Sequence, residues 1–398
     1  MKNQPPFFKK GDGYFLSLDI GTQTIKVLIC KKEEKKIVIF GGSIVSLEPI
    51  AIIDSPAFRI EALRQTILNA IQDAKQISAS REVTKQKTWL TFLGLPPHIL
   101  KGRVSHQNFK RENPGGKIKR KEEEIILKSV ISSSYKNIAQ LVSKEAGLLA
   151  NDIRFLETKV LSIKIDGYKV PQILGFSGEY LEFRILNNLL LKSYLSAIDK
   201  VFRKWDLKIL KIVSPMENLP LALQDTKIDG FFLDIGGKTS QIALVYEGEI
   251  YTITEFPVGG EIFSHQLSEI LGIGEPGAED LKIRYSQRLL SEEVRTRIKE
   301  IFSPAAQFWF SSLKLQLKKH VPSQDFKLLP SSVLFFGGSS QLPEIEDVVT
   351  NGNWEDLIFP ERTETKILLP KDLKNFQDQT KIINTPQYIP SLLICYDA

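Results

Sequence analysis

The stretch FLDIGGKTSQIALV, residues 232–245, has the pattern of a strand, a glycine turn and a second strand. An aspartate stands at the end of the first strand, and small residues follow it through the turn. The same design occurs near the N-terminus in LSLDIGTQTIKVLIC, residues 16–30. Two hairpins of one design, far apart in the chain, indicate two related cores.

Composition limits the class of protein. The chain has 398 residues, 42% of them hydrophobic, which is enough to form more than one compact unit. No apolar run approaches the roughly 20 residues that span a bilayer. The only cysteines, Cys30 and Cys395, rule out a disulfide framework, so we expect a cytoplasmic protein.

Charge is unevenly distributed. The net charge is +6, yet the stretch from Lys101 to Lys121 holds eight basic residues and the single acid Glu112. A solvated loop is the first interpretation of this stretch, and attraction to anionic lipid headgroups is the second. We expect no nucleic-acid partner.

Strands and helices alternate along the chain, which predicts an α/β fold. Strands are predicted at 15–20, 25–30 and 37–40, followed by an amphipathic helix over 63–77. A strand-helix-strand-strand unit is predicted over 87–186, and the acids that open its long helix suit the positive end of a helix dipole.

The two hairpins carry residues suited to phosphate chemistry. Asp19 and Asp234 stand at strand ends, where a carboxylate can hold the waters of a Mg²⁺ ion that bridges phosphates. Lys26 lies in the strand after the first turn, where its ammonium can reach phosphate oxygens. Small turn residues allow backbone N–H groups to point inward and bind an anion, and these residues are Gly21, Thr22, Gly236, Gly237 and Thr239. Two such hairpins facing each other would hold a polyphosphate from both sides.

Two further glycine pairs extend this pattern. Gly337 and Gly338 lie between a predicted strand and a helix, where the backbone can approach a base or a ribose closely. Gly259 and Gly260 open another predicted helix and can border the same cleft. Any one of these turns is usually a plain turn, but four in this order predict a nucleotide cleft.

The ordered set resembles that of the actin-like ATPases, with LDIGTQTIK and LDIGGKTS as phosphate hairpins and FFGGSSQLP as the adenosine turn. Within that superfamily the chain resembles the FtsA family of bacterial cell-division proteins. Residues 165–186, IDGYKVPQILGFSGEYLEFRIL, are similar to part of the inserted SHS2-type subdomain of that family. AEDLKIRYS (278–286) is similar to its nucleotide helix, and TPQYIPSLLICY (385–396) to its closing helix.

The resemblance implies an actin-like ATPase fold, in which two related domains flank a nucleotide cleft and the first carries an SHS2-type insertion. It also implies a domain organisation: domain 1 over 1–86 and 187–226, the inserted subdomain over 87–186, domain 2 over 227–384 with a shortened outer subdomain around 285–330, and a closing helix over 385–398.

The resemblance further implies ATP and Mg²⁺ as cofactors, with Asp19 and Asp234 as the catalytic residues that hold the metal through water. The first phosphate loop would be lined by Gly21, Thr22, Gln23 and Lys26, and the second by Gly236, Gly237, Lys238 and Thr239. The ribose and base would be bordered by Gly259, Gly260, Glu279, Lys282, Gly337, Gly338 and Ser340. Closure of the two halves would then signal occupancy.

The chain departs from its relatives at several positions. Lys238 stands where a third glycine is usual, and Gln241 where an acid is common. Ser214 stands where related ATPases carry a glutamate that positions the attacking water, so we expect weak or no hydrolysis. Lys238 can either point to solvent or place its ammonium beside the γ-phosphate, and the second interpretation predicts that Lys238→Gly weakens ATP binding.

The functional expectation follows from the same resemblance. We expect a scaffold or short filament in bacterial cell division, self-associating and bound to FtsZ or other divisome proteins. The segment after residue 286 is shorter than in the family, in the region that grips the FtsZ tail, and the chain lacks the membrane helix that usually follows. Membrane contact at the inner face of the cell membrane is therefore expected through a partner.

Two alternatives remain open. The shortened outer subdomain favours a PilM-like cytoplasmic adaptor of a type IV pilus or secretion machine. A small-molecule kinase of the same superfamily would need a base aimed at an acceptor hydroxyl, and no acid in a suitable motif stands out.

Overall fold

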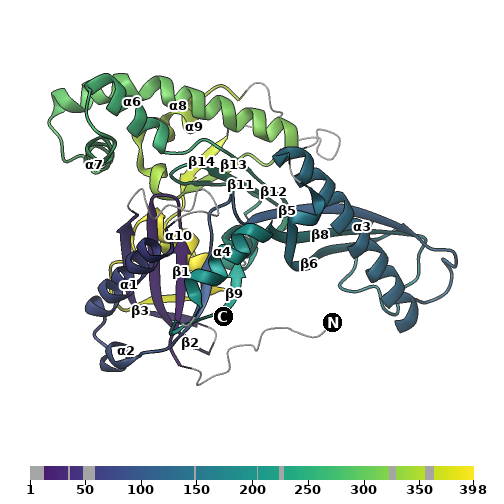
Figure 1. The fold of residues 1–398 in the computed structure, drawn as a ribbon. Coiled ribbons are helices and arrows are strands. Elements are labelled where there is room, and N and C mark those ends of the chain that lie inside the picture. The colour runs from purple at the N-terminus through teal and green to yellow at the C-terminus, as the bar shows by residue number, and fades with distance from the viewer. Residues whose placement is uncertain are drawn as a thin grey trace.

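The computed structural model describes residues 13–34, 36–47, 59–147, 149–203, 205–223, 228–321, 329–354 and 363–398. These residues form two core sheets, with helices on their outer faces, and an insertion that projects to one side (Figure 1). The predicted α/β class with two related cores is confirmed.

The first core sheet combines a three-stranded meander with parallel strands. Its order is β15 (Phe376–Asp378), β3 (Lys36–Ser46), β2 (Thr24–Glu33), β1 (Phe15–Ile20), β4 (Trp89–Gly94) and β9 (Leu207–Val213). Strand β1 is buried along its whole length, at the centre of the sheet. Helices α1 (Ile60–Ile77), α2 (Arg81–Lys85) and α4 (Lys192–Phe202) accompany this half. Leu63, Ile67 and Ala70 recur at three- and four-residue spacing and form the apolar face of α1 that packs on the sheet.

The second core sheet repeats this arrangement. Its order is β12 (Glu249–Phe256), β11 (Ser240–Tyr246), β10 (Gly230–Ile235), β13 (Ser332–Phe336) and β14 (Glu364–Ile367). Its helices are α6 (Glu261–Leu271), α7 (Glu275–Ser286), α8 (Glu292–His320) and α9 (Pro343–Asn351). Trp309 of α8 is fully buried, and its indole N–H donates to Ser240 Oγ at 2.8 Å. This contact fixes α8 above the second hairpin.

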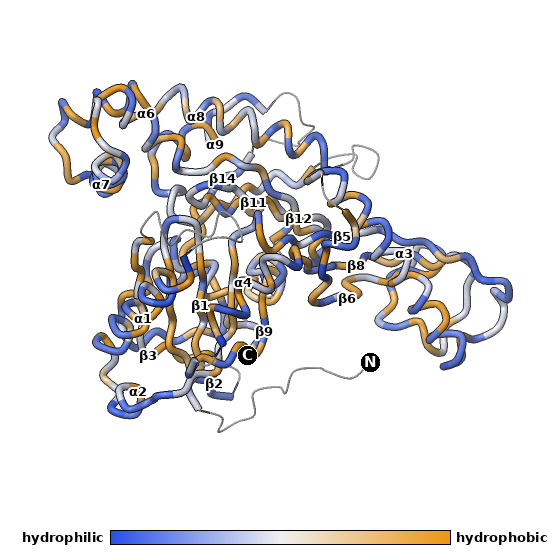
Figure 2. Tube along the Cα trace, in the orientation of Figure 1, coloured by the Kyte–Doolittle hydropathy of each residue, from blue (hydrophilic) through white to orange (hydrophobic). Residues whose placement is uncertain are grey.

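A single apolar core joins the two sheets. It contains Phe15 and Phe92 from the first half together with Phe232 and Phe336 from the second. The short helices α5 (Leu219–Ala222) and α10 (Ile389–Cys395) also contribute to it. Figure 2 shows hydrophobic residues along the strands of both core sheets and hydrophilic residues at the far end of the insertion. The halves therefore meet over a continuous hydrophobic layer beneath the cleft.

The insertion is a separate four-stranded sheet with one long helix. It comprises β5 (Lys101–Lys110), α3 (Arg120–Ala146), β6 (Ile153–Ile165), β7 (Tyr168–Lys169) and β8 (Tyr180–Leu191), with strand order β5-β8-β6-β7. Ile126 and Val130 of α3 pack on Phe183 and Ile185 of β8. Glu122 and Glu123 lie in the first helical turn, as the dipole argument predicts. The strand-helix-strand-strand pattern is therefore present.

Two boundaries differ from the sequence-based bounds. Strand β4 pairs with β1, so the sheet of the insertion begins at Lys101, not at residue 87. Strand β15 pairs with β3 and so belongs to the first core sheet, although it lies within the predicted domain 2. The sequence-based bounds followed the order of the strands along the chain. The sheet to which a strand belongs is decided by its hydrogen-bond partners, which here lie far away in sequence.

The interpretation of 101–121 as a solvated loop is wrong for its first half. Residues Lys101–Lys110 form strand β5, and Arg103 and Arg111 are only 4% and 3% exposed. Their charges are balanced by Glu255 and Glu122, respectively. The basic charge looked uncompensated because one of these acids lies in the second half of the chain.

Much of the predicted outer subdomain is the single helix α8, of 29 residues. Residues 322–328, at the end of that predicted subdomain, lie outside the described residues. Among the helices in the described ranges, none combines the length and apolar character that a membrane span requires.

Candidate nucleotide site

The two hairpins have the same geometry. Asp19 lies opposite Lys26 in the first, and Asp234 lies opposite Gln241 in the second. Each turn is closed by a glycine N–H that donates to a carbonyl three residues on, Gly21 to Thr24 at 2.9 Å and Gly236 to Thr239 at 3.1 Å. Each aspartate therefore stands at the end of a central strand, beside a turn whose glycine the backbone requires.

A cavity of about 520 Å³ lies between the hairpins. The predicted site residues that line it are Asp19, Gly21, Thr22, Gln23, Lys26, Asp234, Gly236, Gly237, Thr239, Glu279, Lys282, Gly337 and Gly338. These residues come from both halves of the chain, so the structure brings most of the predicted site together. Their roles toward a nucleotide remain predictions.

Four predicted residues do not line the cavity. Gly259 and Gly260 lie behind the second hairpin, where the N–H of Gly260 donates to Gly236 O at 2.9 Å. Ser340 is fully buried, and its hydroxyl donates to Gly337 O at 2.7 Å. The side chain of Lys238 lies 3.8 Å from Glu261 Oε1. These residues support the walls of the cavity instead of facing into it.

The two carboxylates share one ammonium. Lys26 Nζ lies 3.0 Å from Asp19 Oδ2, and both side chains are about nine-tenths buried. Burial raises the pKa of Asp234 to about 7; the positive charge of Lys26 opposes this shift and the negative charge of Asp19 adds to it. When both carboxyl groups are ionised, one negative charge is left without a partner among these three groups. This surplus would attract a cation.

This donor set fits a magnesium ion held through water. No cluster of three or more His, Cys, Asp or Glu capable of holding a metal is found within the described ranges. Mg²⁺ keeps most of its waters and is commonly bound by one or two carboxylates together with substrate phosphates.

The far end of the cavity is built on α7. Lys282 Nζ lies 2.7 Å from Glu279 Oε2 and donates to Gly260 O at 3.1 Å. Burial lowers the pKa of Lys282, and the carboxylate of Glu279 opposes the shift. Ser264 Oγ also donates to Glu279, at 2.6 Å. The Glu279 carboxylate is thus fixed at the cavity wall by Lys282 and Ser264.

The halves touch each other across the cleft. The backbone N–H of Lys238 donates to Thr22 Oγ1 at 3.1 Å. Gln23 fills the space beside Gly237 and donates to Glu279 at 3.4 Å. The hairpins of the two halves are therefore in direct contact, which is a closed arrangement of the cleft.

The position of Lys238 changes the expectation for its substitution. Lys238 itself does not line the cavity; its side chain is 28% exposed and lies 3.8 Å from Glu261 Oε1, a residue that does line it. Because partly exposed ion pairs contribute little, we expect Lys238→Gly to leave the affinity for Mg·ATP within about twofold of wild type. Isothermal titration calorimetry measures this change. A loss of about tenfold or more would contradict this expectation and support the phosphate contact considered from the sequence.

Sequence reasoning missed several residues of the cavity. Ser339, not Ser340, lines it, and its hydroxyl donates to Gly236 O at 3.0 Å. Pro96 and Pro97 lie there because they follow β4, which is parallel to β1 and ends beside Asp19. Gln387 and Pro390 reach it from the segment around α10. A signal was available for the proline pair, since β4 repeats the position of β13 in the other half.

Comparisons with known proteins agree with this geometry. Residues 231–392 match the model of the family described as "Cell division protein FtsA". The FtsA of Streptococcus pneumoniae serotype 2 is 20% identical over 83% of this chain and 72% of its own length. The FtsA of Pseudomonas aeruginosa is 26% identical over 51% of this chain and 53% of its own length. That of Neisseria meningitidis serogroup B is also 26% identical, over 68% of this chain and 61% of its own length.

Solved structures share the fold across the whole chain. The PilM–PilN type IV pilus biogenesis complex matches with a TM-score of 0.68 at 13% identity, covering 96% of this chain and 98% of the other. A diol dehydratase-reactivating factor in nucleotide-free form matches with a TM-score of 0.50 at 9% identity, covering 97% and 99%. At such identities these matches establish the fold alone.

Paired hairpins at a cavity between two related halves define the fold of this chain as actin-like. In sequence the chain is similar to the FtsA proteins, through the family model over residues 231–392 and through three relatives at 20–26% identity. The match to the family model lies in the second half, which carries the second hairpin and the turn at Gly337 and Gly338.

Proposed function

We propose that this chain is an ATP-binding, FtsA-like protein that acts as a scaffold or short filament in bacterial cell division, with slow hydrolysis at most. The observation that carries the proposal is the cavity between the two hairpins, with Asp19 and Asp234 at its floor. The similarity to cell-division FtsA proteins supports the biological setting.

The residues of the cavity suggest how a nucleotide would be held. The turn glycines Gly21, Gly236 and Gly237 let backbone N–H groups approach phosphate oxygens. Mg²⁺, held through water by Asp19 and Asp234, would neutralise phosphate charge. Lys26 would add a second positive charge from the first hairpin. The N–H groups and Lys26 come from opposite halves, so a bound polyphosphate would hold the halves together.

Two neutral residues in the cavity are the reason to expect slow hydrolysis. Ser214 and Gln241 both line the cavity. Neither side chain can accept a proton from an attacking water at neutral pH. Glu217 follows Ser214 closely in sequence but is buried outside the cavity lining. Nucleotide would then act mainly as a conformational signal.

A PilM-like adaptor of a type IV pilus or secretion machine is the second candidate. The observation that favours it is the match to the PilM–PilN complex over nearly the full length of both chains. The single long helix α8, in the region of the predicted outer subdomain, also favours this candidate, since the FtsA-like candidate would use that region to bind FtsZ. Under both candidates the chain would bind ATP.

Two measurements test the proposal. We expect wild-type protein to bind ATP in calorimetry in the presence of Mg²⁺ and Asp234→Ala to bind at least about tenfold more weakly, because the metal loses a carboxylate. A pull-down with an FtsZ tail peptide against a PilN peptide separates the candidates, and we expect capture by the FtsZ peptide. Capture by the PilN peptide alone would favour the pilus role. Failure to bind ATP would contradict both.

A further inference from the structure

Residues of β12 pack against the insertion. Strand β12 is the edge strand of the second core sheet, and four of its residues touch the insertion. Their contacts with the insertion are ion pairs of Glu249 with Lys169 and Arg184, a ring contact of Tyr251 with His106, a close approach of Ile253 to Gly102, and ion pairs of Glu255 with Lys101 and Arg103. The insertion is covalently part of the first half, yet it packs against the second.

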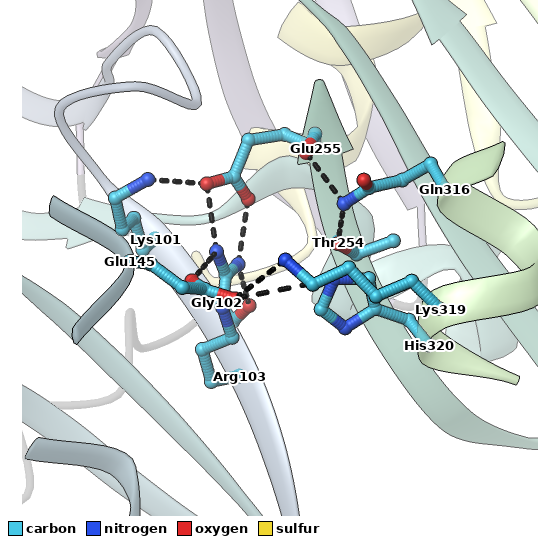
Figure 3. Close-up of polar contacts among 9 residues, drawn as sticks. All are labelled: Lys101, Gly102, Arg103, Glu145, Thr254, Glu255, Gln316, Lys319 and His320. Atoms are coloured by element: carbon cyan, nitrogen blue, oxygen red, sulfur yellow. Dashed lines mark hydrogen bonds and ion pairs between the residues drawn. The ribbon is translucent and has the colours of Figure 1, made fainter. Parts of the chain in front are cut away.

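The cluster around Glu255 holds the most deeply buried of these ion pairs (Figure 3). Arg103 donates two parallel hydrogen bonds to the carboxylate, Nη1 to Oε2 at 2.6 Å and Nη2 to Oε1 at 2.7 Å. Lys101 donates to the same carboxylate. The side chains of Arg103 and Glu255 are only 5% and 8% exposed. Burial would raise the pKa of Glu255, but Arg103 and Lys101 hold it at about 2, so the carboxylate is ionised at neutral pH.

Helix α8 and helix α3 complete the cluster. The Gln316 amide donates to Glu255 O at 2.8 Å and to Thr254 Oγ1 at 2.6 Å. Glu145 of α3 lies 3.4 Å from Arg103 and 3.6 Å from Lys319 of α8 (Figure 3). Two elements of the insertion and two of the second half therefore meet at one carboxylate pair.

The cluster lies directly behind the cavity wall. Asp234, Gln241 and Glu255 are register partners across β10, β11 and β12, so they form one row of the sheet. Gln241 lines the cavity. On the other side, a Cβ placed at Gly102 would lie 3.4 Å from Ser214 Oγ, and Ser214 lines the cavity as well. The Arg103–Glu255 pair thus ties together the two walls of the cavity.

Stability alone does not account for such a pair. Removing two charges from water costs so much that well-packed apolar residues would often stabilise the fold equally well. What a two-point guanidinium–carboxylate contact adds is a defined geometry. Here that geometry relates the insertion to β12, and therefore the first half of the chain to the second.

We propose that the Arg103–Glu255 pair is a latch that holds the two halves of the chain in the closed arrangement of the cleft. The latch and the hairpin contact between Lys238 N–H and Thr22 Oγ1 form in the same closed arrangement. Each therefore favours the other by linkage. A ligand that touches both hairpins would also favour the closed arrangement, so the latch would strengthen its binding. That this ligand is a nucleotide rests on the proposed function.

Hydrogen exchange of the full chain without nucleotide tests the latch directly. The reporter is the amide of Lys238, because its hydrogen bond crosses the cleft. In Glu255→Gln we expect this amide to exchange about fivefold or more faster than in wild type, as the closed arrangement loses population. The matched control is Glu122→Gln, which breaks the pair of Glu122 with buried Arg111 within the insertion and touches neither half-to-half contact. It should leave the Lys238 amide unchanged.

Equal exchange of the Lys238 amide in Glu255→Gln and wild type would overturn the latch, and so would equal acceleration in both variants. If Glu255→Gln fails to fold by circular dichroism, Arg103→Lys, which keeps the charge but loses the two-point contact, takes its place with the same expectation. Calorimetry separates the latch from the proposed function. Wild type that binds no ATP contradicts the proposed function, whereas the exchange result decides the latch either way.

Discussion

Replacing Gly337 with Ala should destabilise the chain by about 3 kcal/mol or more and remove the nucleotide site. Gly337 has φ of 94° and ψ of 174°, a region essentially restricted to glycine. A Cβ there would collide with Asp234 Oδ1 and lie 2.7 Å from Ile235 O and 2.9 Å from Ile235 N. The new methyl group would therefore strain the backbone and displace the carboxylate at the cavity floor. Urea unfolding and calorimetric titration with Mg·ATP measure the two effects.

The neighbouring glycine is a matched control. A Cβ at Gly338 would have no atom within 4 Å, and its backbone does not need positive φ. Gly338→Ala should therefore keep the stability within about 0.5 kcal/mol of wild type. Both residues line the cavity, so a general effect of filling it would appear in both variants. Equal unfolding midpoints for Gly337→Ala and Gly338→Ala would contradict the steric argument.

This pair also shows how far sequence reasoning reached. The turn around Gly337 and Gly338 could be predicted because a strand, two glycines and a helix are local features. The reason for a glycine at position 337 could not be predicted. Only glycine fits there because the Asp234 carboxylate lies too close for a Cβ, and Asp234 is about one hundred positions earlier in the chain. The sequence pointed to a base or ribose near this turn, and the structure adds that the turn also positions the second carboxylate.

The same limit explains the remaining differences. Local pattern correctly predicted the strands of both hairpins and the long helix of the insertion. Pairing between distant residues was not visible, so Arg103 was taken for a solvated residue although Glu255 neutralises it. For Lys238 the glycine turn left two interpretations, solvent or phosphate, and the structure places its ammonium 3.8 Å from Glu261 Oε1 of the following helix.

The repeat of the hairpin reveals an asymmetry that the sequence only hinted at. Lys26 and Gln241 occupy equivalent positions, each opposite an aspartate. An ammonium in one hairpin and a neutral amide in the other leave two carboxylates to share one charge. Burial is the main cause of the raised pKa of Asp234; the charge of Asp19 adds to the shift, and the shared charge of Lys26 only partly opposes it. The departure at Gln241 therefore affects the electrostatics of the whole cavity.

The second large effect is expected at Glu217, where replacement by Gln should stabilise the chain at alkaline pH. Glu217 lies in the turn η3 (Pro215–Asn218), and its side chain is 1% exposed. Three carboxylates meet two ammonium ions there, and the members of this cluster are Glu157, Glu217, Asp397, Lys159 and Lys211. One negative charge is in excess, and the most deeply buried carboxylate is the one that keeps its proton.

The direction of the pH dependence follows from the pKa. Burial raises the pKa of Glu217 from 4.5 to about 7; Lys159 and Lys211 oppose the shift, and Asp397 and Glu157 add to it. Between these values the folded chain binds a proton that the unfolded chain has released, so stability falls as pH rises. The loss is complete above pH 7 and amounts to about 3 kcal/mol. Glu217→Gln cannot ionise and should escape this loss.

Thermal unfolding between pH 5 and pH 9 measures the difference. We expect wild type and Glu217→Gln to be similar near pH 5 and to diverge above pH 7, with the variant more stable. Glu157→Gln tests the charge count, because removing another carboxylate lets Glu217 ionise more easily. The pKa of Glu217 should then be lower, so this variant should lose less stability than wild type between pH 5 and neutral pH. If Glu217→Gln follows wild type in parallel across the whole range, the buried proton lies elsewhere, and Asp234, whose pKa is also about 7, becomes the group to replace.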